Sequence, residues 1–288
     1  MPNLMIVGFK EELSGKTTIA RAFLRYFLDS GIDAIGFKPL SGNNIWKHYD
    51  QVCNTLKEGR LYSNDAKLLN NELIDKIDKD RQPINEELIN PVHRLWNEPA
   101  LIDQLTGIPN FVVDRITLFD GNHQRTVLLD NKTTSFEYID KEKFLKNLNG
   151  KADDIFNIEN IETFNTLVKY YYDSAINSTY DKIKRDFSLV IIESYGDIAL
   201  PWDSSFKELD LVIGVEPWNI YVYEPEKYLD AVEITTLSHF KEVSTNQIKD
   251  LIRPIKKAKY KPVISGKRID AIKKIASDLF RDIGFVNL

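Results

Sequence analysis

The chain has 288 residues, 43% of them hydrophobic, which is enough for one large core or for a core with a smaller module. Its formal net charge of -5 at pH 7 gives no basic footprint, so we expect no nucleic-acid partner. The single cysteine, Cys53, excludes an intrachain disulfide and a thiolate zinc cage. No apolar stretch is long enough to span a membrane and no signal peptide is recognisable, so we expect no membrane partner and a cytoplasmic protein.

The first predicted element is a short apolar strand at residues 4 to 7, whose continuous apolar sequence is typical of a strand buried on both faces. A helix should begin near Lys16, because apolar residues then recur at helical spacing, and Gly31 stands where such a helix would end. The apolar positions of this helix are Ile19, Ala22, Phe23, Tyr26 and Phe27.

The segment between this strand and this helix has the composition of a phosphate-binding loop (P-loop). In such a loop backbone N–H groups surround phosphate oxygens, a lysine at position 16 reaches the β/γ phosphates, and a threonine at position 17 offers its hydroxyl to Mg²⁺. Six residues separate Gly8 from Gly15, more than in the common pattern. The alternative is that Gly15 only permits a tight turn and Lys16 is a solvated charge. The candidate nucleotide-binding residues are Gly8, Lys10, Glu11, Glu12, Ser14, Gly15, Lys16, Thr17 and Thr18.

A second strand is predicted at residues 32 to 37, reached by a short turn from the helix. The resulting β-α-β unit predicts an α/β fold with a mostly parallel sheet. Residues 43 to 106 read mainly as helices and loops, interrupted by several prolines. These breaks are Pro83, Pro91, Pro99 and Pro109.

Strands are predicted at residues 111 to 119 and 125 to 129, joined by a hairpin turn at Asp120-Gly121-Asn122, with a third strand at residues 135 to 139. We expect one domain over residues 1 to 288, with these strands forming an antiparallel β insertion within residues 107 to 145.

Residues 152 to 185 return to a helical pattern with an aromatic stripe, which we interpret as core, the alternative being stacking on a cofactor. Residues 188 to 192, 209 to 215 and 262 to 264 are further strand candidates, and a helix at residues 268 to 283 closes the chain. The basic stretch 253 to 261 is either a solvated face or a polyanion site, and the acidic balance of the chain favours the first.

Three other residues are candidates for chemistry because they lie where predicted strands end or in a nearby loop. Lys38 directly follows the second strand and offers a positive charge to an anionic substrate or to the γ-phosphate. Asp65 and Glu193 are carboxylates suited to hold Mg²⁺ directly or through water. Each also has an ordinary structural interpretation.

Five segments together resemble dethiobiotin synthetase and its relatives among the P-loop proteins. The family has, in order, G-K-T, G-[YF]-K-P-x-x-S-G, S-D-A, N-P-[YV] with a later proline turn, and E-G-A-G-G. The corresponding segments here are Gly15-Lys16-Thr17, Gly36-Phe37-Lys38-Pro39-Leu40-Ser41-Gly42, Asn64-Asp65-Ala66, Asn90-Pro91-Val92 with Glu98-Pro99, and Glu193-Ser194-Tyr195-Gly196. The resemblance covers about residues 1 to 106 and 186 to 216.

The resemblance implies a doubly wound parallel sheet, binding of MgATP, and ATP-dependent activation of a small carboxylate, carbamate or amine substrate. By position, Lys16 and Lys38 would act on the transferred phosphate. Thr17, Asp65 and Glu193 would hold Mg²⁺, and either Glu11 or Glu12 would face the metal. In the synthetases of this family the substrate is a diamine. Ser194 and Tyr195 replace small residues of the family and would fill the pocket that accepts this diamine.

The alternative function is a nucleotide-dependent switch, in which hydrolysis controls a protein partner without a small-molecule product. Related switch ATPases use a lysine early in the loop that reaches across a dimer interface, and Lys10 lies near that position. A homodimer is the assembly that both kinds of relative imply.

Overall fold

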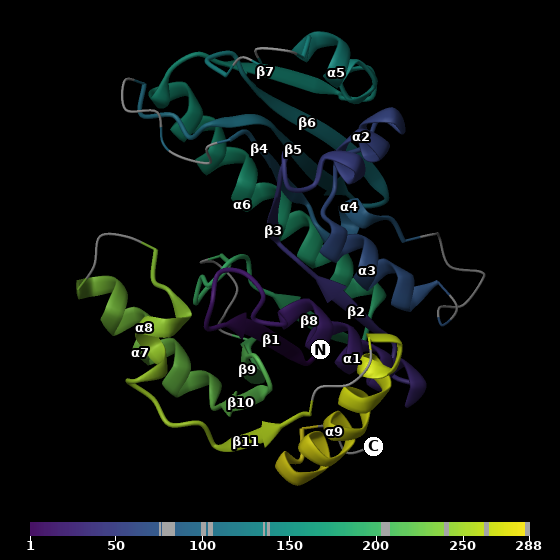
Figure 1. Ribbon diagram of the computed structural model, residues 1–288, viewed down its shortest axis with the longest axis vertical. Coiled ribbons are helices and arrows are strands. Elements are labelled where there is room, and N and C mark those ends of the chain that lie inside the picture. The colour runs from purple at the N-terminus through teal and green to yellow at the C-terminus, as the bar shows by residue number, and fades with distance from the viewer. Residues whose placement is uncertain are drawn as a thin grey trace. The chain divides into compact units, whose positions relative to one another are not determined.

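The computed structural model describes residues 1–74, 76, 84–98, 102, 106–134, 136, 139–202, 208–238, 242–261 and 265–285. The protein belongs to the α/β class, and its two sheets both mix parallel and antiparallel strands and are flanked by helices (Figure 1). The chain forms two compact units, the first from residues 1–39, 68–84 and 183–288 and the second from residues 40–67 and 85–182. The strands expected at residues 111 to 119 and 125 to 129 lie within the second unit.

The first unit contains a six-stranded sheet in the order β11-β10-β9-β1-β8-β2. The strands β9, β1, β8 and β2 run parallel, whereas β10 and β11 add an antiparallel edge. The bounds are β1 (Asn3–Gly8), β2 (Ala34–Phe37), β8 (Leu189–Glu193), β9 (Leu211–Glu216), β10 (Asn219–Tyr223) and β11 (Lys256–Lys259). The strands β1, β8 and β2 are buried along their whole length, as their continuous apolar sequences predict.

Helix α1 (Lys16–Asp29) connects β1 to β2 and begins and ends where the sequence predicts. The closing helix α9 (Arg268–Ile283) packs against it, with the Phe280 ring centroid 4.9 Å from that of Phe23 and 4.8 Å from that of Phe27. The helical spacing of α1 therefore serves to bury its aromatic face against both the sheet and α9. The remaining elements are α7 (Pro225–Ser238), α8 (Thr245–Lys249) and the 3₁₀ turn η2 (Ser265–Lys267).

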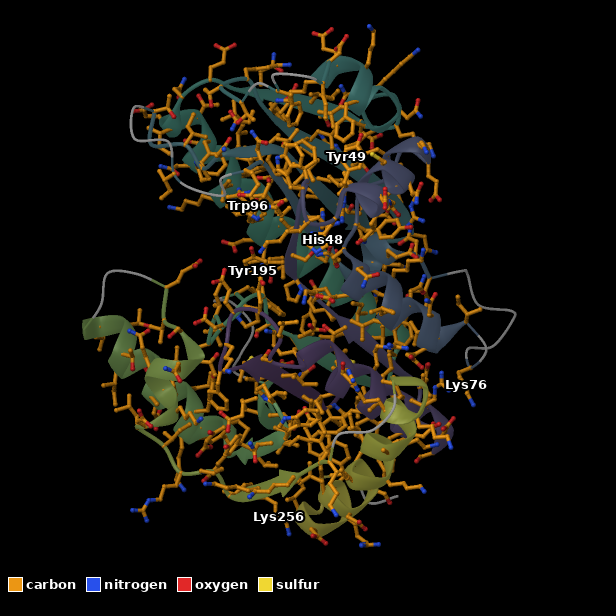
Figure 2. All side chains as sticks on the ribbon, viewed as in Figure 1. His48, Tyr49, Lys76, Trp96, Tyr195 and Lys256 are labelled. Atoms are coloured by element: carbon orange, nitrogen blue, oxygen red, sulfur yellow. The ribbon has the colours of Figure 1, made fainter. Side chains whose placement is uncertain are left out.

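The basic stretch at residues 253 to 261 forms the edge strand β11. Lys257 and Lys259 on this strand are exposed, and Lys256, labelled in Figure 2, forms an ion pair with Asp282 at 2.8 Å. Lysines on an edge strand oppose pairing with another sheet. The exposure of these lysines fits the interpretation as a solvated face, and the strand itself was not predicted.

The second unit contains a five-stranded sheet in the order β3-β4-β5-β6-β7. The pairs β3–β4 and β6–β7 are parallel, while β4–β5 and β5–β6 are antiparallel. The predicted hairpin is confirmed, with Asp120 opposite His123 and a φ of 59° at Gly121 in the two-residue loop. The bounds are β3 (Leu40–Asn44), β4 (Val92–Trp96), β5 (Phe111–Asp120), β6 (His123–Asn131) and β7 (Asp154–Ile158).

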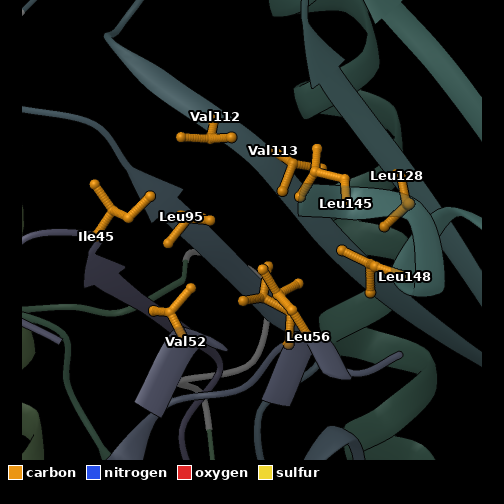
Figure 3. Close-up of a cluster of buried hydrophobic side chains, with 10 residues drawn as sticks. Ile45, Val52, Leu56, Leu95, Val112, Val113, Leu128, Leu145 and Leu148 are labelled. Carbon is orange, nitrogen blue, oxygen red and sulfur yellow. The ribbon is translucent and has the colours of Figure 1, made fainter. Parts of the chain in front are cut away.

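The apolar core of the second unit joins its sheet to two helices (Figure 3). Helices α2 (Tyr49–Lys57) and α5 (Lys141–Asn149) contribute Val52, Leu56, Leu145 and Leu148 to a cluster with strand residues such as Leu95 and Leu128. The short helix α4 (Glu86–Ile89) belongs to the same unit, and the boundary between units falls within α3 (Asn64–Leu73) and α6 (Ile161–Asp186).

The aromatic stripe of α6 is structural, as its core interpretation predicts. The Phe164 ring packs 5.4 Å from Phe111, and the Tyr171 ring packs 5.5 Å from Phe156. The Tyr172 hydroxyl donates to the Asp114 carboxylate, which also receives two hydrogen bonds from Arg94. The stripe therefore covers the sheet of the second unit.

One part of the predicted secondary structure is wrong, because residues 154 to 158 form β7 rather than helix. Residues 43 to 106 are mainly helices and loops where the structure describes them, as predicted, but β4 and the end of β3 within this stretch were not predicted. The strand β10 was not predicted. The segments of β3 and β7 carry polar residues or a glycine, so their state depends on pairing with neighbours, whereas the sequence of β10 suits a strand and was overlooked. The strand predictions at residues 135 to 139 and 262 to 264 fall wholly or mostly outside the described residues.

None of the helices in the described part of the chain combines the length and the hydrophobicity that a membrane span requires.

Candidate functional site

The candidate site lies in the first unit, at the carboxyl ends of three parallel strands. β1 ends at Gly8, β2 ends at Phe37, and β8 between them ends at Glu193. Phe37 is in register with Ile192, so Lys38 follows β2 at the level of Glu193. Ligands bind at this edge in open α/β sheets. The sheet order therefore brings together residues that are far apart in sequence.

The loop from Gly8 to Gly15 folds back over its own first residue. A Cβ atom built on Gly8 would lie 2.5 Å from Ser14 Oγ and 2.8 Å from Lys16 Nζ, so these two side-chain ends would have to move to make room for it. Gly15, with a φ of 94°, stands at the N-cap of α1 in the left-handed region, which glycine adopts without strain. Gly8 thus leaves room for the Ser14 and Lys16 side chains, and Gly15 permits the positive φ at the start of the helix.

The start of this loop is held by Phe9. Its backbone N–H donates to the carbonyl of Val215 at 3.1 Å, its ring packs edge-on to Tyr221 at 5.5 Å, and Lys249 Nζ lies 4.7 Å from the ring centroid. Tyr221 also donates to Glu216, and burial together with this carboxylate raises the pKa of Tyr221 to about 12. Phe9 thus fixes the chain where it leaves β1.

Lys16 is buried and directed into the loop. Its Nζ atom donates to the carbonyl oxygen of Gly196 at 2.5 Å and to Ser14 Oγ at 3.2 Å. Both acceptors are neutral oxygen atoms, one of a backbone carbonyl and one of a hydroxyl group. The ammonium is therefore already held among oxygens at the N-terminus of α1, where the first backbone N–H groups of a helix point outward.

Thr17, Lys38 and Glu193 form a connected cluster. Thr17 Oγ1 donates to Glu193 Oε1 at 2.7 Å, and Lys38 Nζ donates to the same oxygen at 2.8 Å. The side chains of Lys38 and Glu193 are 4% and 1% exposed, so this ion pair is shielded from water. A buried charge is costly unless it is paired and hydrogen-bonded, and this arrangement satisfies that condition.

The oxygen atoms of Thr17 and Glu193 are metal ligands that suit Mg²⁺ better than a transition metal. A threonine hydroxyl and a carboxylate are oxygen ligands of the kind that Mg²⁺ takes together with phosphates and waters. Over the residues that the structure describes, no group of three or more His, Cys, Asp or Glu side chains is placed to hold a metal ion. Among the described residues the cluster therefore offers two oxygen ligands, which is fewer than a metal site built from protein side chains alone would have.

The polar residues of the loop differ in exposure. Lys10, Glu11 and Glu12 are exposed, Ser14 is buried, and Thr18 is half-buried. Glu11 lies beside Gly196, because a Cβ atom built on that glycine would lie 3.8 Å from Glu11 Cγ. Glu11 thus approaches the residue that accepts the hydrogen bond from Lys16.

Other motif residues belong to the second unit. Asp65 lies in the first turn of α3, and its role as a metal ligand stays a prediction. Ser41 on β3 contacts Asn90 Oδ1 at 2.6 Å and His93 Nδ1 at 2.7 Å, and all three side chains are buried. Two of the matched segments are thus in contact with each other within this unit.

Sequence reasoning missed three features around the loop. Gly196 was part of a matched segment, but its role as the hydrogen-bond acceptor for Lys16 was not predicted. The carbonyl group faces Lys16 because Gly196 lies in a backbone turn with a φ of 53°. Tyr195 in the same turn is labelled in Figure 2 and is half-buried. Trp218 and Tyr260 were also missed, because nothing in the spacing of the sequence indicates that their segments lie near the loop.

The fold and this cluster define an α/β protein with a lysine-threonine-carboxylate site at the carboxyl edge of parallel strands. No protein-family model matches the sequence, and no curated protein matches it either.

Proposed function

We propose that this protein is a P-loop nucleoside triphosphatase that binds MgATP and resembles dethiobiotin synthetase. The observation that carries the proposal is the convergence of Lys16, Thr17 and Lys38 around the Gly8 loop and Glu193. Each of the three has the chemistry that its position in the motif requires. The parallel order β9-β1-β8-β2, with α1 connecting β1 to β2, also supports the doubly wound type for the first unit.

The site suits phosphate binding because the ammonium groups of Lys16 and Lys38 already donate hydrogen bonds to oxygen atoms. Phosphate oxygens would take the place of the Gly196 carbonyl on Lys16, and the outward-pointing N–H groups at the start of α1 would bind the remaining oxygens. Mg²⁺, when bound, would neutralise phosphate charge. We propose that Thr17 and Glu193, whose side chains are hydrogen-bonded to each other, would hold it.

The reaction we propose is activation of a small carboxylate or carbamate. An oxygen of that group attacks the γ-phosphorus, the bond to the β-phosphate oxygen breaks, and ADP leaves with the electron pair. An amine then displaces phosphate from the activated carbon. Lys38 would stabilise the charge on the transferred phosphoryl group, while Lys16 holds the β/γ oxygens. Asp65, the third predicted metal ligand, is included in this proposal by its motif position.

The experiment is a measurement of ADP release in the presence of MgATP, with and without 7,8-diaminopelargonate and bicarbonate. Stimulation by both compounds supports a synthetase-like ligase. Lys38→Ala should abolish the stimulated release and keep the affinity for MgATP. Binding of MgATP without stimulation points to another carboxylate or amine, and absence of MgATP binding contradicts the proposal.

One observation favours the switch ATPase as a second candidate. Lys10 is exposed on the loop, and the neighbouring Leu13 is 92% exposed with a φ of 57°, so the loop presents a cation and an apolar side chain outward. In this function a nucleotide-bound homodimer would cover them. Lys10→Ala would then uncouple dimerisation from MgATP, as measured by sedimentation with and without nucleotide.

A further inference from the structure

Beside the Gly8 loop, the β9–β10 hairpin carries an aromatic side chain in an unfavourable backbone conformation. Glu216 pairs with Asn219, so the hairpin loop consists of Pro217 and Trp218 alone. Trp218 has a φ of 71°, in the left-handed region that residues with a Cβ rarely adopt. A proline followed by a residue of positive φ forms a type II turn, in which glycine or asparagine is usual at the second position.

The turn itself does not explain the indole ring. Glycine at position 218 would form the same turn without strain, and the ring is 45% exposed, so its burial contributes little to the core. Strained residues of this kind persist where the surrounding structure enforces them, and they gather at functional sites. Neither the turn nor packing in the core therefore accounts for a tryptophan at position 218.

Tyr260, which directly follows β11, connects this ring to the phosphate loop. Its backbone N–H donates to the Trp218 carbonyl at 3.1 Å, and the two ring centroids are 5.7 Å apart. A Cβ atom built on Gly15 would lie 3.4 Å from the Tyr260 hydroxyl oxygen. The Tyr260 hydroxyl thus lies beside the N-cap of α1, and the Trp218 ring packs on the Tyr260 ring within the same unit.

We infer that Trp218 and Tyr260 form the stacking surface for the base of the nucleotide. This inference rests on the proposed function and extends it, because a phosphate loop alone binds polyphosphate and nucleotide equally. A half-exposed indole that packs on Tyr260 offers the large aromatic surface on which a nucleobase stacks, with the ribose spanning the distance from the α-phosphate. The site therefore takes a nucleoside triphosphate, with the purine rings favoured by their larger area.

The test compares a ligand that has a base with one that lacks it. Calorimetry measures the binding of MgATP and of magnesium tripolyphosphate to the wild type and to Trp218→Gly, a substitution that also relieves the backbone strain. We expect the affinity for MgATP to fall by roughly five- to a hundredfold, the range typical of losing one base-stacking contact, and the affinity for tripolyphosphate to stay unchanged. Trp46→Gly, which removes a 71% exposed indole in the second unit, should leave both affinities unchanged.

A second readout is the quenching of tryptophan fluorescence by MgATP. Quenching should persist in Trp46→Phe and disappear in Trp218→Phe, which keeps an aromatic ring and most of the affinity. Equal MgATP affinity in the wild type and Trp218→Gly would overturn the inference alone. So would equal losses for MgATP and tripolyphosphate, since the ring would then act through the loop. If the wild type binds neither ligand, the proposed function fails and this inference fails with it.

Discussion

Lys38 and Glu193 form a buried ion pair across neighbouring parallel strands, with Nζ of the lysine 2.8 Å from Oε1 of the carboxylate. One residue follows β2 and the other ends β8, and 155 positions separate them in the chain. The carboxyl edge of the sheet thus brings a cation and an anion together where water is excluded, beside the loop that begins at Gly8.

The ion pair makes a prediction about stability. Lys38→Met removes the ammonium that faces a carboxylate only 1% exposed, and breaking a buried pair in this way costs about 3–5 kcal/mol. The double variant Lys38→Met with Glu193→Gln removes both charges and should recover much of this loss. Urea denaturation of the two single variants and the double variant measures the coupling. Additive effects would show that the two side chains do not interact in solution.

A second prediction concerns Thr17 and magnesium. Thr17→Ala removes the hydroxyl that donates to Glu193 at 2.7 Å and that we assign to Mg²⁺. We expect the affinity for ATP in the presence of Mg²⁺ to fall by about ten- to a hundredfold, as for loss of one hydrogen bond or ligand on a charged group, with a smaller effect in EDTA. Thr17→Ser keeps the hydroxyl and is the matched control. Equal losses with and without Mg²⁺ would contradict the assignment.

A third prediction tests the closure of the loop over Gly8. The Cβ of Gly8→Ala would collide with Ser14 Oγ at 2.5 Å and with Lys16 Nζ at 2.8 Å, so Lys16 must move. Overpacking of this kind costs about 1–3 kcal/mol, and we also expect weaker nucleotide binding. Gly266→Ala is the control, because its Cβ meets no atom within 4 Å among the described residues. Thermal unfolding and nucleotide titration of both variants decide the question. Identical behaviour of the two would count against the loop geometry.

A fourth prediction concerns pH and the contact between α1 and α9. Hydrogen bonds from Lys273, then from Lys76, lower the pKa of Asp29 below its ordinary value of 3.8. Because the folded pKa is the lower one, the carboxylate stabilises the fold above pH 3.8, and this contribution is lost as the pH falls through the lowered pKa.

Asp29→Asn should therefore reduce the free energy of unfolding at neutral pH by up to about 1 kcal/mol, as expected for a partly exposed ion pair. The difference from the wild type should shrink in acid. Asp230→Asn, at an exposed position on α7, should have no such pH dependence. Urea unfolding at several pH values makes the comparison. A difference that grows on acidification would reverse the predicted sign.

The elements that could be predicted from the sequence are those with a strong local pattern. β1, β2 and β8 are continuous apolar strands, α1 and α9 have a clear helical period, and the β5–β6 hairpin has a glycine turn. By contrast, Leu40–Asn44 contains a glycine and two asparagines, and Lys256–Lys259 contains three lysines. These segments become strands because a neighbouring strand satisfies their backbone hydrogen bonds, which the local sequence does not encode.

The residues of the candidate site likewise fall into some that could be predicted from the sequence and others that could not. Lys16, Thr17, Lys38 and Glu193 could be predicted because each follows or ends an apolar strand or opens a helix, and the structure brings these four together. The Gly196 carbonyl could not be predicted, since it belongs to the backbone of a turn. Trp218 and Tyr260 could not be placed either, because their contact depends on the antiparallel pairing of β10 with β11.

The most direct test of the central claim is a calorimetric titration of MgATP into the wild type and Lys16→Ala. Lys16 is buried in the loop, whereas Lys274 on α9 is exposed, so Lys274→Ala controls for the loss of one positive charge. The account predicts specific binding to the wild type and to Lys274→Ala, and binding weakened by about a hundredfold or more in Lys16→Ala, since Lys16 makes charge-assisted contacts to phosphate. Equal affinity of Lys16→Ala and the wild type would contradict the assignment of this loop as the phosphate site.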